Sequence, residues 1–357
     1  KVALFGRLTA WDAMIPPLFF RFGQYEALTF IPNPSHGVIP VVLALLACRS
    51  LLIENGWARL AALTAISFFA SHTGFGFFLP PMLIGVLLLR GIYEWRNRAR
   101  AAMSFLTATA VGVAAATMLV GFRFEELRAV PCRFGSPTVT DHVIWVITMV
   151  KASFGFLGRD ELAIAGATLV YLIPAASALA VSVTRIARTV PDSDDEREFS
   201  LAATPAVLIC VSVAFCLSSA WARLCLGPVQ ALDSRYVTLM IPFAIGLYFS
   251  IIRWDVERGM SGATSARKVV RLALLAVLMV SSVHGGFHIA QSDRAGVERS
   301  RETKRAWVAC ARAGGTVAEC DFRSQLKVHP VPSATRLDEK LEFLRERRLS
   351  FFRPDYE

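Results

Sequence analysis

Long apolar segments constrain this chain more than any other feature of its sequence. A helix needs about 20 mostly apolar residues to cross the ~30 Å hydrocarbon core of a bilayer. Segments of about this length recur along the whole chain, separated by short polar connections. They are 37–52, 60–72, 74–89, 102–121, 162–183, 202–219, 236–252 and 269–289. The pattern predicts an all-α polytopic transmembrane helix bundle with about 8 spans and a small soluble C-terminal tail.

Composition supports this fold class and excludes others. Hydrophobic residues make up 54% of the 357 residues and charged residues 18%, with a mean hydropathy of +0.49. Soluble domains carry about 25% charged residues, so this chain is too apolar to be disordered or covered by polar surface. Its 7 cysteines form no CxxC pair and its histidines do not cluster, which excludes a zinc ribbon or finger.

Two stretches leave the path of the chain open. The segments 60–72 and 74–89 meet at Gly74 and Gly76, which favour a tight reversal between two spans. A single long kinked helix is the alternative. The segment 141–157 is apolar but contains Lys151, and we interpret it as a re-entrant or interfacial helix rather than a span.

Basic residues indicate the orientation of the bundle. The net charge is +10, but lysine and arginine lie between the apolar segments instead of clustering on one soluble face. We therefore expect no nucleic-acid partner. Short connections on one side carry Arg49, Arg59, Arg90, Arg96, Arg98, Arg100, Arg185, Arg188, Arg197, Arg253, Arg258, Arg267, Lys268 and Arg271. The longer segments of the other side carry Lys1, Arg7, Arg21, Arg123, Arg128, Arg133, Lys151, Arg159, Arg223 and Arg235. The positive-inside rule places the first set in the cytoplasm. The prediction is a multi-pass protein of the plasma (inner) membrane with its C-terminal tail on the outer, periplasmic side.

Three regions follow from this topology. Residues 1–36 form an outward-facing interfacial segment, 37–290 form the transmembrane bundle, and 291–357 form an outward-facing soluble tail. The chain begins with Lys1, and residues 2–5 lack a signal-peptide layout, which indicates a fragment or a processed form.

The tail contains two cysteines ten residues apart, Cys310 and Cys320. In an oxidising compartment we expect them to form a disulfide, and two unpaired thiols are the alternative. Leu337, Leu341 and Leu344 recur at helical spacing and predict a short amphipathic helix that packs on the outer domain or the membrane surface.

Acidic residues near the start of the chain are the candidates for catalysis. A carboxylate of Asp12 or Glu26 at the edge of a lipid-facing cleft would act as a general base or help to hold a divalent cation. We count Arg7 of the same segment among the substrate-binding candidates. The alternative is an interfacial anchor, because prolines, aromatics and arginines surround Asp12.

Basic residues next to predicted spans are the candidates for substrate binding. The planar donors of Arg235 suit a lipid phosphate, with Asp233 orienting the guanidinium, and a snorkelling arginine is the alternative. His36 is a candidate for proton transfer or ligand binding, or it simply ends a helix in water. His284 and His288 have metal-ligand spacing but no third ligand nearby in the sequence, so we predict no metal site there.

Three short motifs carry a family resemblance. They are Pro34–Ser35–His36, Asp233–Ser234–Arg235–Tyr236 and the stretch LEFLRERRLSF at 341–351. With them the chain resembles a group of uncharacterised bacterial polytopic membrane proteins that is similar in layout to the GT-C glycosyltransferases. That resemblance implies a polyprenyl-phosphate sugar donor used on the outer face. It also implies a catalytic acid in the first outer loop, which we match to Asp12 and Glu26.

Two functions therefore stand as expectations. The first is a GT-C-like glycosyltransferase that transfers a sugar from a polyprenyl-phosphate donor among the membrane lipids. The second is a non-enzymatic transporter or a lipid or envelope assembly component. The chain has no clear internal repeat and few ionisable residues at the centres of its spans, which disfavours an ion-coupled transporter.

Overall fold

The computed structural model describes residues 1–20, 36–120, 138–154, 165–189, 196–224, 231, 234–256, 265–326, 328 and 336–353. Every regular element in these ranges is a helix. The chain divides into two compact units, Lys1–Ile289 and Ala290–Glu357, with the division next to the predicted start of the tail.

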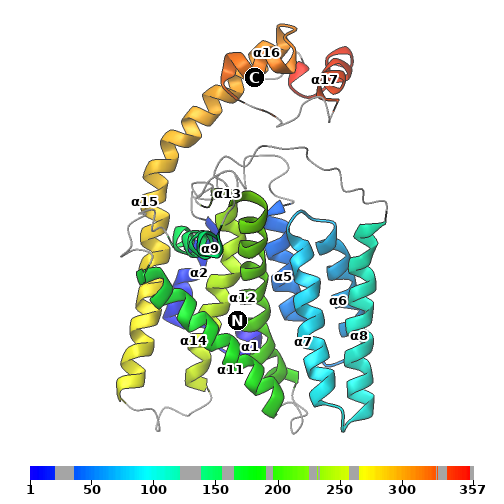
Figure 1. Ribbon diagram of the computed structural model, residues 1–357, viewed down its shortest axis with the longest axis vertical. Helices are drawn as coiled ribbons and strands as arrows, with labels where there is room; N and C mark the ends of the chain where they lie inside the picture. The colour runs from blue at the N-terminus through cyan, green and yellow to red at the C-terminus, as the bar shows by residue number, and fades with distance from the viewer. Residues whose placement is uncertain are drawn as a thin grey trace. The chain divides into compact units, whose positions relative to one another are not determined.

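The first unit is a bundle of long helices. Each predicted span overlaps one of them. They are α5 (Val38–Ser50), α6 (Gly56–Ser71), α7 (Leu79–Tyr93), α8 (Arg98–Ala116), α11 (Ile173–Thr189), α12 (Glu196–Arg223), α14 (Ile241–Val256) and the first part of α15 (Ser265–Arg312). Figure 1 shows α5 to α8 as neighbouring helices on one side of α12.

Four helical stretches in the described residues are long and apolar enough to cross a membrane. These are Gly76–Tyr93, Arg98–Leu119, Ala165–Ala187 and Arg197–Arg223. The apolar helices Val38–Ser50 and Thr238–Arg253 are shorter. The protein is therefore helical and membrane-associated, whereas the number of about eight spans remains a prediction.

Short helical elements connect the long ones. They are α1 (Val2–Phe5), η1 (Ala10–Met14), α2 (Ile15–Phe20), η3 (Gly76–Phe78), η4 (Thr117–Leu119), α9 (Val139–Ser153), the π-helix η5 (Thr168–Leu172), α13 (Ser234–Val237) and η8 (Thr238–Met240).

The predicted reversal between α6 and α7 is present. Helix α6 ends at Ser71, and α7 begins at Leu79 after a turn and η3. Neither glycine of the turn has a positive φ. Instead, a Cβ on Gly74 would clash with the His36 ring, and one on Gly76 would clash with the Ala70 carbonyl oxygen. The turn needs glycine for close approach rather than for its conformational freedom.

Helix α9 lies across the bundle rather than along it. Figure 1 shows α9 end-on, whereas α12 runs along the vertical of the view. The exposed Val139 begins α9, and its C-terminal half is buried, with Lys151 0% exposed. The interfacial or re-entrant character of this helix remains a prediction.

The two ends of the bundle differ in chemistry. One end, which we call the basic end, holds the last turn of α5 with Arg49, the first turn of α12 with Arg197, and the last turn of α14 with Arg253. Trp221, near the end of α12, lies 24 residues after Arg197, which corresponds to a rise of about 36 Å. We call the end with Trp221 the histidine end because His36 also lies there.

Exposed tryptophans mark both ends. Trp57 at the start of α6 and Trp95 just after α7 lie at the basic end, and Trp221 lies at the histidine end. Their side chains are 64%, 70% and 84% exposed. Tryptophans at both ends of apolar helices are typical of the two membrane–water interfaces.

Some of the basic residues counted as flanking charges are buried. These are Arg59, Arg90 and Arg253. Both Nε and Nη2 of Arg90 donate to Oε1 of Glu94 at 3.0 Å, and Ser104 donates to Oε2 of the same carboxylate at 3.1 Å. A buried charge needs such partners because leaving water is costly.

The first residues of the chain and His36 lie at opposite ends of the bundle, and the outer-face placement of residues 1–36 remains a prediction. The Leu4 carbonyl accepts a 2.9 Å hydrogen bond from Nε of Arg197, at the basic end. His36 instead packs against Gly74 and lies 6.2 Å from the Phe75 ring, at the opposite end. Pro16 and Pro17 interrupt an apolar run in the sequence. For that reason the sequence did not indicate that the segment passes from one end of the bundle to the other. In the structure both prolines lie in the first turn of α2, where proline is tolerated.

The second unit contains the end of α15, α16 (Val317–Ser324), α17 (Leu337–Glu346) and η10 (Ser350–Phe352). The predicted disulfide is present, with the Sγ atoms of Cys310 and Cys320 2.08 Å apart. Both cysteines, Trp307 and Leu341 belong to the core of this unit. Leu341 therefore packs the amphipathic helix α17 against α15 and α16.

Candidate functional site

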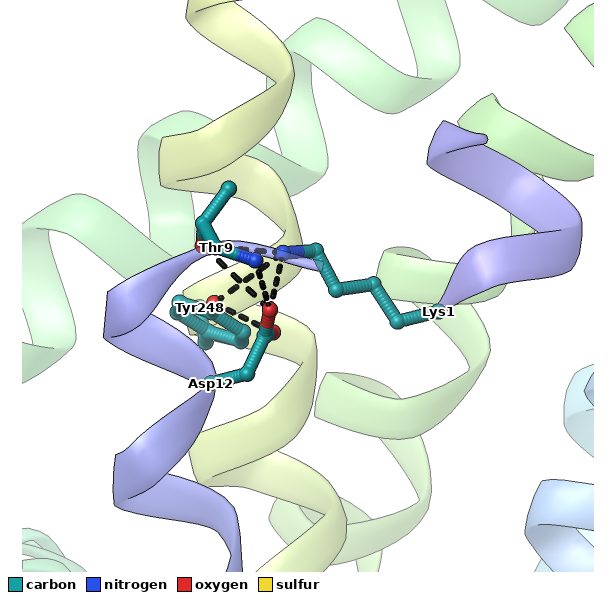
Figure 2. A network of polar contacts seen from close by, with 4 residues as sticks. All are labelled: Lys1, Thr9, Asp12 and Tyr248. Carbon is teal, nitrogen blue, oxygen red and sulfur yellow. Dashed lines mark hydrogen bonds and ion pairs between the residues drawn. The ribbon is translucent and has the colours of Figure 1, made fainter. Parts of the chain in front are cut away.

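Asp12 lies in a network of four polar side chains at the basic end. The short helix η1 begins at Ala10 because Asp12 closes a capping box with Thr9. Figure 2 shows Lys1, Thr9 and Tyr248 converging on the Asp12 carboxylate. Its Oδ2 atom accepts from Lys1 Nζ at 2.6 Å and from the Thr9 backbone amide at 2.5 Å. Its Oδ1 atom accepts from the Tyr248 hydroxyl at 2.7 Å.

This network joins the N-terminal segment to α14. Lys1 is 4% exposed and Asp12 14% exposed in their side chains, and Lys1 also lies 3.0 Å from the Thr9 hydroxyl. Next to it the Phe5 and Phe249 rings meet edge to face at 5.5 Å. Both carboxylate oxygens of Asp12 are occupied by donors. Asp12 therefore acts here as an anchor, and a carboxylate already neutralised by an ammonium fits poorly as a divalent-cation ligand.

The structure separates Asp12 from the predicted phosphate-binding element. Arg235 lies in α13, which continues through η8 into α14 without a break. Tyr248, the partner of Asp12, follows Arg235 by 13 residues, a rise of about 20 Å. Asp12 and Arg235 therefore do not form one site, contrary to the joint role that the resemblance implies for them.

A row of rings at the histidine end brings other predicted residues together. The His36 ring lies 6.2 Å from Phe75, Phe75 lies 4.8 Å from Phe215, and Phe215 lies 5.6 Å from Tyr236. The Arg223 guanidinium lies 5.7 Å from the Tyr236 ring. We call these five residues the aromatic row. It connects His36 to α13, the helix of Arg235, across residues that are far apart in the sequence.

Helix α9 adds polar groups at the same end. The His142 ring lies 6.2 Å from the exposed Trp221 ring. Asp141 accepts hydrogen bonds of 2.7 Å from both the backbone amide and the hydroxyl of Thr138, which caps α9. These hydrogen bonds from Thr138 hold the pKa of the Asp141 carboxyl below its usual range. A carboxylate with a lowered pKa is a weak general base, so Asp141 is committed to capping.

The remaining candidates are placed as follows. Arg7 is exposed in the connection between α1 and η1, at the basic end. Glu26 and Asp233 lie outside the described residues. The helical backbone of α13 and α15 is described at Arg235, His284 and His288, but their side chains are not.

Sequence reasoning missed the partners that complete each cluster. Tyr248 is 236 residues from Asp12, and Arg223 is 13 residues from Tyr236 with a connection between two helices in between. No sequence pattern pairs them. The cap of α9 had a readable signal, because Thr138-x-x-Asp141 before an apolar run is a capping-box motif.

Comparison with known proteins does not assign this chain to a family. No family model, curated protein or solved structure matches it.

Proposed function

We propose that this protein is an integral membrane glycosyltransferase of GT-C-like layout that takes its sugar from a polyprenyl-phosphate donor at the histidine end. The observation that carries the proposal is the aromatic row, which joins His36 to α13 and adds the cation of Arg223. Guanidinium groups bind phosphate through several donors, and aromatic rings with apolar surroundings suit the membrane interface.

The catalytic carboxylate of this proposal is Glu26. The resemblance implies a carboxylate in the first outer loop, and Asp12 is placed at the other end of the bundle with both oxygens occupied. Asp141 serves as a helix cap. Glu26 precedes His36 by ten residues in the sequence. In this role Glu26 would accept the proton of the acceptor hydroxyl as that oxygen attacks the sugar carbon, and polyprenyl phosphate would leave.

The orientation belongs to the same proposal. Positive charge concentrates at the basic end, and the disulfide of the second unit is typical of an oxidising compartment. The positive charge favours a cytoplasmic basic end in the inner membrane, and the disulfide favours a periplasmic location of the C-terminal unit.

The test is a transfer assay with the full-length protein in lipid nanodiscs. The substrate is a set of radiolabelled polyprenyl-phosphate sugars, and the readout is release of polyprenyl phosphate together with a labelled acceptor. We expect Arg235→Ala to lower turnover by at least about tenfold, since it removes a charged hydrogen bond, and Glu26→Gln to abolish turnover. Arg98→Ala, which removes an exposed cation at the basic end, is the matched control. Absence of transfer from every donor by the wild-type protein would refute the enzymatic proposal.

A second candidate is lipid-phosphate binding without transfer, as in a transporter or an envelope assembly component. It is favoured by the commitment of both Asp12 and Asp141 to hydrogen bonds within the chain. Tight binding of a polyprenyl phosphate without any turnover, unaffected by Glu26→Gln, would select this function over the enzyme.

A further inference from the structure

The second unit presents a basic and apolar surface on the side of α17 that points away from its own core. Leu341 belongs to that core, and Phe343 lies about 200° further around the helix. Lys340 and Arg347, three residues before and four after Phe343, lie on the same helix face as Phe343. We propose that this surface docks on the headgroups of an anionic phospholipid bilayer. The inference concerns the C-terminal unit and is independent of the proposed function.

Two large apolar side chains are exposed on this surface. Phe343 is 54% exposed, and Leu349, three residues after the end of α17, is 44% exposed. The Arg347 guanidinium lies 5.8 Å from the centroid of the Phe343 ring. This pair suits the boundary between headgroups and hydrocarbon, because the ring enters the apolar layer while the guanidinium stays among the headgroups.

Contacts within the unit engage most of the acidic groups of α17. Glu339 pairs with Arg336, and Glu342 accepts a 2.5 Å hydrogen bond from Arg345. Asp338 accepts a 2.8 Å hydrogen bond from the backbone amide of the first residue of α16. The other charged side chains between Lys340 and Leu349 are those of Lys340, Glu346, Arg347 and Arg348, and all four are exposed. Positive charge is therefore in excess here, and anionic lipids attract such a surface.

Arg348 occupies a position at which helices usually have glycine. The Leu349 amide donates to the Leu344 carbonyl at 2.9 Å. The Arg348 amide donates to the Arg345 carbonyl at 3.1 Å, and these two bonds make a Schellman motif. Its turn residue is left-handed, and Arg348 has a φ of 50°. This conformation disfavours any side chain and suits glycine. Arginine here costs folding stability, which is the mark of a side chain that serves a contact outside the unit.

The way the unit is attached favours a bilayer as the partner. Helix α15 is continuous from Ser265 to Arg312, so the unit is covalently tied to a helix whose first part overlaps a predicted span. A tether raises the effective concentration of the surface near the headgroups. Each basic residue beside an anionic membrane then strengthens docking about fivefold. An acidic protein would offer the charge but not the tether.

Lipid quenching on the full-length protein in nanodiscs tests the proposal. A fluorophore on Leu349→Cys replaces one apolar group with another, and doxyl-labelled phosphatidylcholine is the quencher. We expect at least about fivefold stronger quenching in nanodiscs that contain phosphatidylglycerol than in pure phosphatidylcholine. Salt at about 1 M, which shortens the screening length to about 3 Å, should abolish the difference. Both leaflets have one composition, so the result does not depend on orientation. The protein without the substitution gives the background of the native cysteines.

A label on Phe322→Cys of α16 is the matched control. Phe322 is 78% exposed, but Glu319 and Asp321 lie on the same short helix. We expect this label to remain in water in both lipid mixtures. Absence of quenching at Leu349→Cys would overturn docking, including the case in which the label is immobilised by a protein. Equal quenching at both positions would overturn the assignment to this surface.

Variants at the arginines separate docking from folding. Arg348→Gly should keep or raise the resistance of the unit to chymotrypsin, because glycine suits the turn, and should reduce docking about fivefold. Arg347→Gln/Arg348→Gly should reduce docking at least about tenfold. Arg301→Gln/Arg323→Gln removes the same charge from exposed positions of α15 and α16 and should change docking less than about twofold. Undiminished quenching in Arg347→Gln/Arg348→Gly, or an equal loss in the control pair, would refute the surface.

Discussion

The hydroxyl of Tyr248 donates a 2.7 Å hydrogen bond to Oδ1 of Asp12, across 236 residues of the chain. This bond ties the first helical turns of the protein to the last third of its bundle. It also assigns Asp12 a structural task at Tyr248, a residue that follows Arg235 by about 20 Å along α13, η8 and α14.

Removal of this bond should loosen the N-terminal segment. Tyr248→Phe deletes a hydrogen bond to an ionised, mostly buried carboxylate, which we expect to cost about 1.5–3 kcal/mol. Thermal unfolding in detergent measures the loss as a lowered Tm. Tyr93→Phe, at the end of α7 and outside this network, is the control. Equal Tm values for the two variants would contradict the anchoring role of Asp12.

Replacing Glu94 alone should cost more stability than replacing Arg90 and Glu94 together. Glu94→Leu leaves the Arg90 guanidinium buried without its carboxylate, and we expect a loss of about 3–5 kcal/mol. The double variant Arg90→Met/Glu94→Leu should recover most of that loss, because no buried charge remains. Chemical unfolding of both variants gives the comparison. A double variant as unstable as the single one would show that the packing of these side chains matters more than their charge.

Loss of the disulfide should expose the second unit to proteases. Cys310→Ser removes a crosslink with a sequence separation of 10, worth about 2–3 kcal/mol. We expect faster trypsin cleavage within 290–357, and treatment of the wild type with dithiothreitol should reproduce it. Cys210→Ser, at a free and partly exposed cysteine of the bundle, should leave this cleavage unchanged. Resistance of Cys310→Ser equal to that of the wild type would argue that helix packing alone holds the unit.

The stability of the second unit should depend on pH because of the capping box at the start of α16. The Thr316 backbone amide and hydroxyl hold the pKa of the Glu319 carboxyl below its usual value. A lowered folded-state pKa contributes stability that is present above the unfolded pKa, about 4.3, and is lost as the pH falls through the folded value. Trypsin resistance is measured after brief incubation at each pH between about 5 and 3. It should decline toward low pH in the wild type and depend less on pH in Glu319→Gln.

The placement of Arg7 and His36 at opposite ends of the bundle can be tested directly. Arg7→Cys and His36→Cys should react with a membrane-impermeant maleimide from opposite sides of the membrane. Under the proposed orientation, His36→Cys is labelled in spheroplasts and Arg7→Cys only after permeabilisation. The protein without either substitution, which carries all the native cysteines, supplies the background. Labelling of both variants from one side would support the single outer face that charge counting predicts.

Several features could be predicted because they depend on local sequence. Apolar runs located the helices, since a span must satisfy its backbone internally whatever its neighbours are. The reversal at Gly74 and the disulfide of Cys310 with Cys320 also follow from short-range spacing. The sequence by itself therefore determined the helical class, the connections and the composition of the tail.

Only the tertiary structure decided which polar groups meet. Asp12 and Arg235 were matched through their residue types and the resemblance. In the structure Tyr248, the partner of Asp12, follows Arg235 by a rise of about 20 Å along α13, η8 and α14. His36, Phe215 and Tyr236 come from separate parts of the chain and meet through helix packing. Packing of apolar faces sets such distances, and many sequences with the same span pattern would pack differently. For that reason the pattern of spans predicts the fold class, whereas the candidate site can be located only in the packed bundle.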